Sequence, residues 1–111
     1  MPRPVASSLT EKQVRAAVIK RLPILFGKDC YWVSNSPGPW STSGRPDLEV
    51  CPFDGPYRGM FVAIELKAGR YGLHPEDGLT VEQDVTLRRI SKAGGICFVA
   101  NSPLFDSWVR W

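Results

Sequence analysis

The sequence lacks the residue patterns of several common protein classes. Its three cysteines, Cys30, Cys51 and Cys97, form no CxxC pair, and His74 is its only histidine. A zinc site of the usual kind would have too few ligands at the right spacing, so we expect reduced, mostly buried thiols. Even an apolar run such as Met60–Ile64 is far too short to cross a bilayer.

The chain also lacks an apolar segment near its start, where it reads Met-Pro-Arg-Pro. A signal peptide needs such a segment, so we expect a protein that is not secreted, stays in the cytoplasm and has no membrane partner. Repeats and low-complexity segments are absent, and 43% of the residues are hydrophobic while 23% are charged. These proportions are those of a globular protein, and a chain of 111 residues suits one domain spanning residues 1–111.

The charge balance does not name a function. A net charge of +3 permits binding to a polyanion without requiring it. Any functional inference therefore has to come from individual residues and their spacing.

Capping-box pairs open two predicted helices. Thr10, with Gln13 three residues later, precedes apolar residues at helical spacing, and this helix should end at Pro23. Thr80 opens a second helix, which should stop at the Gly94-Gly95 pair.

Four apolar segments predict strands, at residues 30–34, 47–51, 60–68 and 96–100. The turn-rich stretch Pro52–Gly59 predicts a hairpin between the second and third strands. The helix between the third and fourth strands has the length of a crossover, so those strands should be parallel. A short final helix is expected from Ser102. The order α-β-β-β-α-β-α predicts an α/β fold, with a mixed central sheet flanked by helices.

The third predicted strand carries two charged residues within an apolar run. Side chains alternate across a strand, so Val62, Ile64 and Leu66 should face a core while Glu65 and Lys67 share the other side. Both charged groups can then reach one point in space. The alternative is a solvent-facing salt bridge on a half-exposed sheet.

Asp47 begins the preceding strand, directly after Pro46, which fixes the approach of the chain. If the hairpin forms, Asp47 can lie beside Glu65, and two close carboxylates repel each other unless a cation lies between them. Hard oxygen ligands suit Mg²⁺, with Mn²⁺ as a substitute, and Lys67 beside the ion can position an attacking water and stabilise charge on a phosphate. Alternatively, Asp47 is a turn or cap residue.

Two further polar residues fit the same centre. Glu11 lies three and seven residues before Val14 and Val18, on one side of the first helix, although an acid in a first turn also suits the helix dipole. Gln83 shares a side with Leu87, although the capping box alone would explain it.

Five basic residues are candidates for contacts with DNA phosphates. Arg45 and Arg70 flank the proposed centre, and a patch on the second helix contains Arg88, Arg89 and Lys92. A solvated helix face would have the same composition as this patch.

The combined motifs resemble a known family. Arg-Pro-Asp followed by Glu-Leu-Lys at the end of an apolar strand is similar to the PD-(D/E)xK nuclease signature. More narrowly, the chain from Thr10 to about Trp108 resembles the stand-alone, virus-type VRR-NUC domains. The segments that carry this likeness are Gly-Arg-Pro-Asp-Leu (44–48), Phe-Val-Ala-Ile-Glu-Leu-Lys (61–67), Leu-Thr-Val-Glu-Gln (79–83) and Ala-Gly-Gly-Ile-Cys-Phe-Val-Ala (93–100).

The resemblance implies a restriction-endonuclease-like core and a Mg²⁺-dependent DNA endonuclease. Asp47 and Glu65 would bind the metal, together with the backbone carbonyl of Leu66. Lys67 would be the catalytic lysine, and Gln83 would match the glutamine of the following helix.

Three further features follow from the resemblance. Glu11 would act on the metal through water. Relatives of this compact form are similar to Holliday-junction resolvases and tend to act as homodimers on branched DNA, so both properties are expected. The loop Arg70–Gly78 departs from the family pattern, since it looks longer and more acidic, and this leaves substrate geometry open.

Two alternatives remain at this point. One is a DNA-binding or scaffold module that keeps the fold but does not cut. The other is a sequence-specific restriction-type or homing nuclease, for which 111 residues leave little room for a recognition domain.

Overall fold

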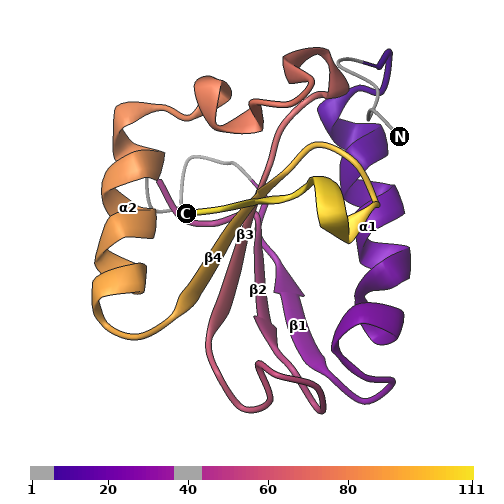
Figure 1. Cartoon of the computed structure of the whole chain (residues 1–111), viewed down its shortest axis with the longest axis vertical. Coiled ribbons are helices and arrows are strands. Elements are labelled where there is room, and N and C mark those ends of the chain that lie inside the picture. Colours follow the sequence, from indigo (N-terminus) through magenta and orange to yellow (C-terminus); the bar gives the residue numbers. More distant parts are fainter. Residues whose placement is uncertain (1–6, 37–43) are drawn as a thin grey trace.

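The computed structural model describes residues 7–36 and 44–111, which form a five-stranded sheet with a helix on each face (Figure 1). The strands lie side by side in the order in which they occur in the chain. The elements are α1 (Glu11–Phe26), β1 (Tyr31–Ser34), β2 (Leu48–Cys51), β3 (Val62–Leu66), α2 (Val81–Lys92), β4 (Ile96–Ala100) and β5 (Val109–Arg110).

The sheet is mixed, as the sequence predicts. β3 and β4 are parallel, with α2 as their crossover, whereas the other neighbouring pairs are antiparallel. The turn-rich stretch after β2 does form the connection to β3, and the register pairs Leu48 with Ile64. Continuing that register by one residue places Asp47 opposite Glu65.

Each helix covers one face of the sheet through an apolar stripe. On α1, Val14, Val18 and Leu22 are fully buried against the larger part of the core, to which β3 contributes its alternate residues. On α2, Leu87 is buried with Ala63 of β3 on the opposite face. The spacing of buried positions thus confirms both helices and the inward face of β3.

The predicted end of the first helix is wrong. α1 continues through Pro23 and ends at Phe26, which is 2% exposed. A proline costs a helix one backbone hydrogen bond. The burial of Leu22 and Phe26 on one side, four residues apart, favours continuing the helix for its last turn.

The predicted final helix is also wrong, because the chain forms a single 3-10 turn at Phe105–Ser107 and then β5. β5 pairs with the outer edge of β4, whose backbone groups would otherwise lack partners. Trp108 is drawn into the core, where its ring centroid lies 5.7 Å from that of Phe98. The spacing of Leu104, Trp108 and Trp111 fits a helix, but sheet pairing determines the structure.

Within residues 7–36 and 44–111, no helix is both long enough and apolar enough to cross a bilayer.

Gly44 fixes how the chain enters β2, since it packs against the backbone of α2. Its φ is +80°, and a Cβ atom there would lie 2.6 Å from the Glu82 carbonyl oxygen. We expect Gly44→Ala to cost about 1–2 kcal/mol for the left-handed backbone and about 1–3 kcal/mol more for the clash. Urea unfolding measures the loss. Gly55→Ala is the matched control, because Gly55 has φ +83° but nothing within 4 Å. Equal losses in the two variants would refute the close contact.

Candidate active site

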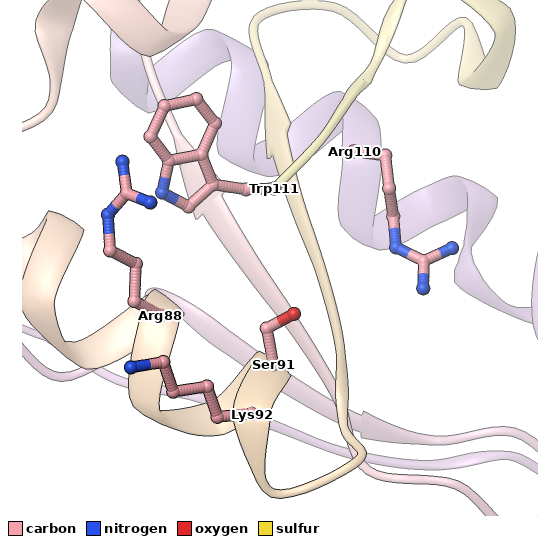
Figure 2. Close-up of a pocket in the computed structure, with 5 residues that line it drawn as sticks. All are labelled: Arg88, Ser91, Lys92, Arg110 and Trp111. Atoms are coloured by element: carbon pink, nitrogen blue, oxygen red, sulfur yellow. The ribbon is translucent and has the colours of Figure 1, made fainter.

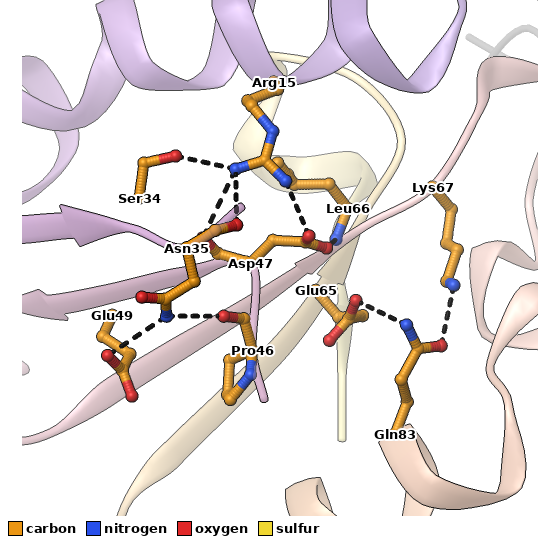
Figure 3. Close-up of polar contacts among 10 residues, drawn as sticks. All are labelled: Arg15, Ser34, Asn35, Pro46, Asp47, Glu49, Glu65, Leu66, Lys67 and Gln83. Carbon is orange, nitrogen blue, oxygen red and sulfur yellow. Dashed lines mark hydrogen bonds and ion pairs between the residues drawn. The ribbon is translucent and has the colours of Figure 1, made fainter. Parts of the chain in front are cut away.

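The start of β2 and the end of β3 bring two carboxylates together (Figure 3). Asp47 precedes β2, and its Oδ2 accepts a hydrogen bond of 2.8 Å from the backbone N–H of Leu66. Glu65 lies opposite it on β3. The structure therefore joins the two acids that the sequence singled out, through the predicted hairpin pairing.

Glu65 is a buried acid, and one of its two carboxylate oxygens has no hydrogen-bond partner among the described residues. Its side chain is 1% exposed, and Oε1 accepts a hydrogen bond of 2.9 Å from Nε2 of Gln83. Oε2 is buried and has no hydrogen-bond partner among the described residues. An unpaired buried oxygen of this kind is costly unless something else binds it.

The environment of Glu65 disfavours its negative charge. Burial, followed by the close approach and negative charge of the Asp47 carboxylate, raises the pKa of Glu65 from 4.5 to about 10. The positive charge of Lys67 opposes this rise, and Glu11 adds slightly to it. Without a cation, the pair would hold a proton on Glu65 at neutral pH.

Lys67 lies on the same side of β3 as Glu65, as the alternation of side chains predicts. It is 7% exposed, and its Nζ donates a hydrogen bond of 2.8 Å to Oε1 of Gln83. Gln83 thus connects the lysine and Glu65, with its carbonyl oxygen toward one and its amide nitrogen toward the other (Figure 3). This arrangement excludes the alternative of a solvent-facing salt bridge.

Gln83 also makes the capping box at the start of α2. Its Oε1 accepts a hydrogen bond of 2.9 Å from the Thr80 backbone N–H, while its own N–H donates to the Thr80 hydroxyl. Gln83 therefore caps α2 and also contacts both Glu65 and Lys67. The cap fixes the side chain that Glu65 and Lys67 share.

Arg15 is a residue of the site that sequence reasoning missed. Its Nη2 lies 2.7 Å from Oδ1 of Asp47, and Nη1 donates a hydrogen bond of 2.7 Å to the Ser34 hydroxyl. The available signal was its place on α1, directly beside the buried stripe at Val14 and Val18. That position distinguishes Arg15 from the exposed lysines of the helix.

Glu11 is exposed at the first turn of α1, and the α1 side chain that contacts Asp47 is that of Arg15. The charge of Glu11 nevertheless contributes to the raised pKa of Glu65, so it acts on the centre at a distance.

Two of the predicted DNA-contacting residues lie near the centre, and each already has a protein contact. Arg45 is 3.3 Å from the Glu49 carboxylate, and the guanidinium of Arg70 lies 4.4 Å from the ring centroid of Tyr71. Both contacts are on the exposed surface, where such pairs contribute little and exchange easily.

The other three lie further along α2, on exposed positions. Figure 2 shows two of them, Arg88 and Lys92. Lys92 is nine residues after Gln83, which is about 13 Å along a helix axis. Arg88 and Lys92 line a pocket of about 420 Å³ with Ser91, Arg110 and Trp111. Arg88 packs over the indole ring of Trp111 at 5.1 Å, whereas Arg110 points away from both in Figure 2. Arg89 is exposed on the same helix. The structure thus places this patch apart from the two carboxylates.

The loop Arg70–Gly78 folds over the lysine. It consists mainly of two 3-10 turns, Gly69–Tyr71 and Pro75–Gly78. A Cβ atom at Gly78 would lie 2.8 Å from the Tyr71 ring and 3.0 Å from Cδ of Lys67. The loop therefore shields the stem of Lys67 from solvent.

The donor set available for a metal ion is small. Among residues 7–36 and 44–111, no group of three or more His, Cys, Asp or Glu side chains converges on one point. Two carboxylates do, and Glu65 Oε2 lacks a partner in the described part of the chain. Mg²⁺ needs only one or two protein carboxylates, because waters and phosphate oxygens complete its shell. The unpaired oxygen and the repulsion between the acids therefore fit a hard divalent cation.

Comparison of the chain with protein-family models, with curated proteins and with solved structures found no match.

Proposed function

We propose that this protein is a cytoplasmic, Mg²⁺-dependent DNA endonuclease of the VRR-NUC type, with a restriction-endonuclease-like core. The observation that carries the proposal is Glu65, a buried acid beside Asp47 that is linked through Gln83 to Lys67 and has one oxygen without a partner in residues 7–36 and 44–111. The motif resemblance agrees with the same residues. We also propose that Glu11 acts on the metal through a water molecule.

Asp47 and Glu65 would hold the ion through their carboxylates. A strand residue directs its N–H and C=O toward the same neighbouring strand, and the Leu66 N–H faces Asp47. This supports the Leu66 carbonyl as a third ligand. When bound, Mg²⁺ would lower the pKa of a coordinated water and neutralise charge on a phosphate group.

Lys67 would supply the fixed positive charge next to the reacting phosphate. Its Nζ has three donors, and Gln83 takes one of them. The other two N–H donors of Nζ could point toward the attacking water or toward a phosphate oxygen on which negative charge grows. Gln83 prevents the ammonium group from turning away.

The rival proposal is a scaffold or DNA-binding module that does not cut. A buried acid and a buried lysine stabilise a fold no better than well-packed apolar residues would. A fold without chemistry would therefore gain nothing from Glu65 and Lys67, which are 1% and 7% exposed. This argument favours an enzyme over a scaffold. It does not distinguish the proposed endonuclease from a sequence-specific restriction-type enzyme.

A nicking assay on supercoiled plasmid separates these proposals. We expect nicks with Mg²⁺ or Mn²⁺, none with EDTA, and none from the Asp47→Asn variant, which removes one ligand charge while preserving shape. Binding without nicking under all metal conditions would establish the scaffold instead.

Substrate choice and assembly need their own measurements. We propose a homodimer acting on branched DNA, with contacts to phosphates from Arg45, Arg70, Arg88, Arg89 and Lys92. A panel of four-way junctions, flaps, nicked and linear duplexes of matched sequence tests the substrate, with faster cleavage of the junction expected. Light scattering on the purified protein tests the dimer.

A further inference from the structure

We infer that Arg15 is a positioning residue of this centre, holding the Asp47 carboxylate in the orientation in which it faces Glu65. The inference rests on the proposed function, because it concerns the same two carboxylates. It assigns a role to a residue of α1 that the motif does not contain.

The guanidinium of Arg15 connects three parts of the chain. Nη2 donates to Oδ1 of Asp47 at 2.7 Å, and Nη1 donates to the Ser34 hydroxyl at 2.7 Å and to the Asn35 carbonyl at 3.3 Å. The Asn35 N–H in turn donates to the Asp47 carbonyl at 2.8 Å. One side chain of α1 therefore ties the end of β1 to the residue that directly precedes β2 (Figure 3).

Both oxygens of Asp47 are held by fixed donors. Oδ1 receives the Arg15 guanidinium and Oδ2 receives the backbone N–H of Leu66. These two bonds restrict rotation about both side-chain torsions. A carboxylate oxygen has a second lone-pair site, so each oxygen can accept its hydrogen bond and still coordinate a cation.

The ion pair between Arg15 and Asp47 is also more buried than a neighbouring surface ion pair. The side chains of Arg15 and Asp47 are 21% and 15% exposed, compared with 47% and 22% for the neighbouring pair of Arg45 with Glu49. Arginine is suited to this position because its rigid planar fork holds several acceptors in one fixed geometry, whereas the ammonium group of lysine is a point charge on a flexible stem. Removing a group that hydrogen-bonds to a metal ligand commonly lowers metal affinity or activity about 10–100-fold.

The test compares three substitutions at Arg15 with one elsewhere. Arg15→Gln removes the charge, Arg15→Lys retains charge without the fork, and Arg15→Ala leaves space for a guanidinium ion. The matched control is Arg58→Gln, since Arg58 is exposed in the turn between β2 and β3. The readouts are Mn²⁺ affinity measured by electron paramagnetic resonance in the absence of DNA, kcat and KM for cleavage, and circular dichroism.

We expect Arg15→Gln to weaken Mn²⁺ binding by about tenfold or more and to lower kcat by a similar factor. KM for DNA should change little. Arg15→Lys should fall in between, and added guanidinium ion should restore part of the Mn²⁺ affinity of Arg15→Ala but none in Arg15→Gln, whose side chain fills the space. A role confined to stabilising the fold would not give this selective rescue.

The outcomes separate the two proposals. If the wild type itself binds no Mn²⁺, the proposed metal centre fails. If the wild type binds Mn²⁺ and Arg15→Gln binds it as Arg58→Gln does, only the inference about Arg15 is overturned. Should Arg15→Gln fail to fold, the inference is decided by Arg15→Lys, and unchanged Mn²⁺ affinity there overturns it.

Discussion

Replacing Lys67 with methionine is expected to abolish DNA cleavage while leaving DNA binding nearly intact. Methionine fills the space of the lysine stem, which is buried under the loop before α2. It removes the ammonium group that would stabilise charge on the phosphate. Loss of a single such donor typically lowers kcat by about 10²–10³-fold. Single-turnover cleavage of a labelled four-way junction measures the rate, and gel shifts in Ca²⁺ measure binding.

Lys20→Met is the matched control for this experiment. Lys20 is exposed on α1 and is not part of the proposed centre, so rates and binding should match those of the wild type. Circular dichroism would check that both variants are folded. A Lys67→Met protein that cuts at the wild-type rate would eliminate the mechanism, whatever metal it binds.

The acidic and amide residues of the site were predictable because their placement is local. Strand alternation puts Glu65 and Lys67 on one side of β3, and helical spacing puts Gln83 on the inward side of α2. The hairpin then requires only a short connection to bring Asp47 beside them. Each element is predicted from residues a few positions apart, and the order of the elements then brings Asp47, Glu65 and Gln83 together.

The errors come from pairing and packing with other elements, which a local sequence pattern does not reveal. β5 forms because the backbone groups along one edge of β4 can pair with it. No pattern within residues 102–111 indicates that this edge is available. α1 passes Pro23 because Phe26 has a place in the core. Arg15 and Asp47 are separated by 32 positions, and helical spacing alone favoured Glu11 over Arg15 as the residue facing the sheet.

The second large effect concerns the stability of the metal-free protein and its dependence on pH. The pKa of Glu65 is raised by burial and by Asp47 to about 10, against 4.5 for an exposed glutamate. Between these values the unfolded chain loses the proton that the folded chain keeps. The contribution to stability is therefore fully present below about pH 4.5 and is progressively lost as pH rises toward 10.

Glu65→Gln should remove this dependence, because glutamine resembles the protonated acid and does not titrate. We expect the variant to be more stable than the wild type in EDTA, by a margin that grows from pH 6 to pH 8. The growth cannot exceed about 1.4 kcal/mol per pH unit for one proton. Urea unfolding at the two pH values measures it, and the difference between the proteins cancels groups that titrate in both.

If the proposed metal centre is correct, Mg²⁺ should reverse the order of stability, because the ion would bind the ionised form of Glu65 and would have to displace its proton. We expect Mg²⁺ to stabilise the wild type, more strongly at pH 8 than at pH 6, and to leave Glu65→Gln almost unchanged. Calorimetric titration in two buffers of different ionisation enthalpy should reveal the released proton. A margin between the proteins that stays constant with pH would show that Glu65 ionises normally. Equal stabilisation of both proteins by Mg²⁺ would show that Glu65 is not a ligand, since a neutral amide would bind the ion much more weakly than the carboxylate of the proposed centre.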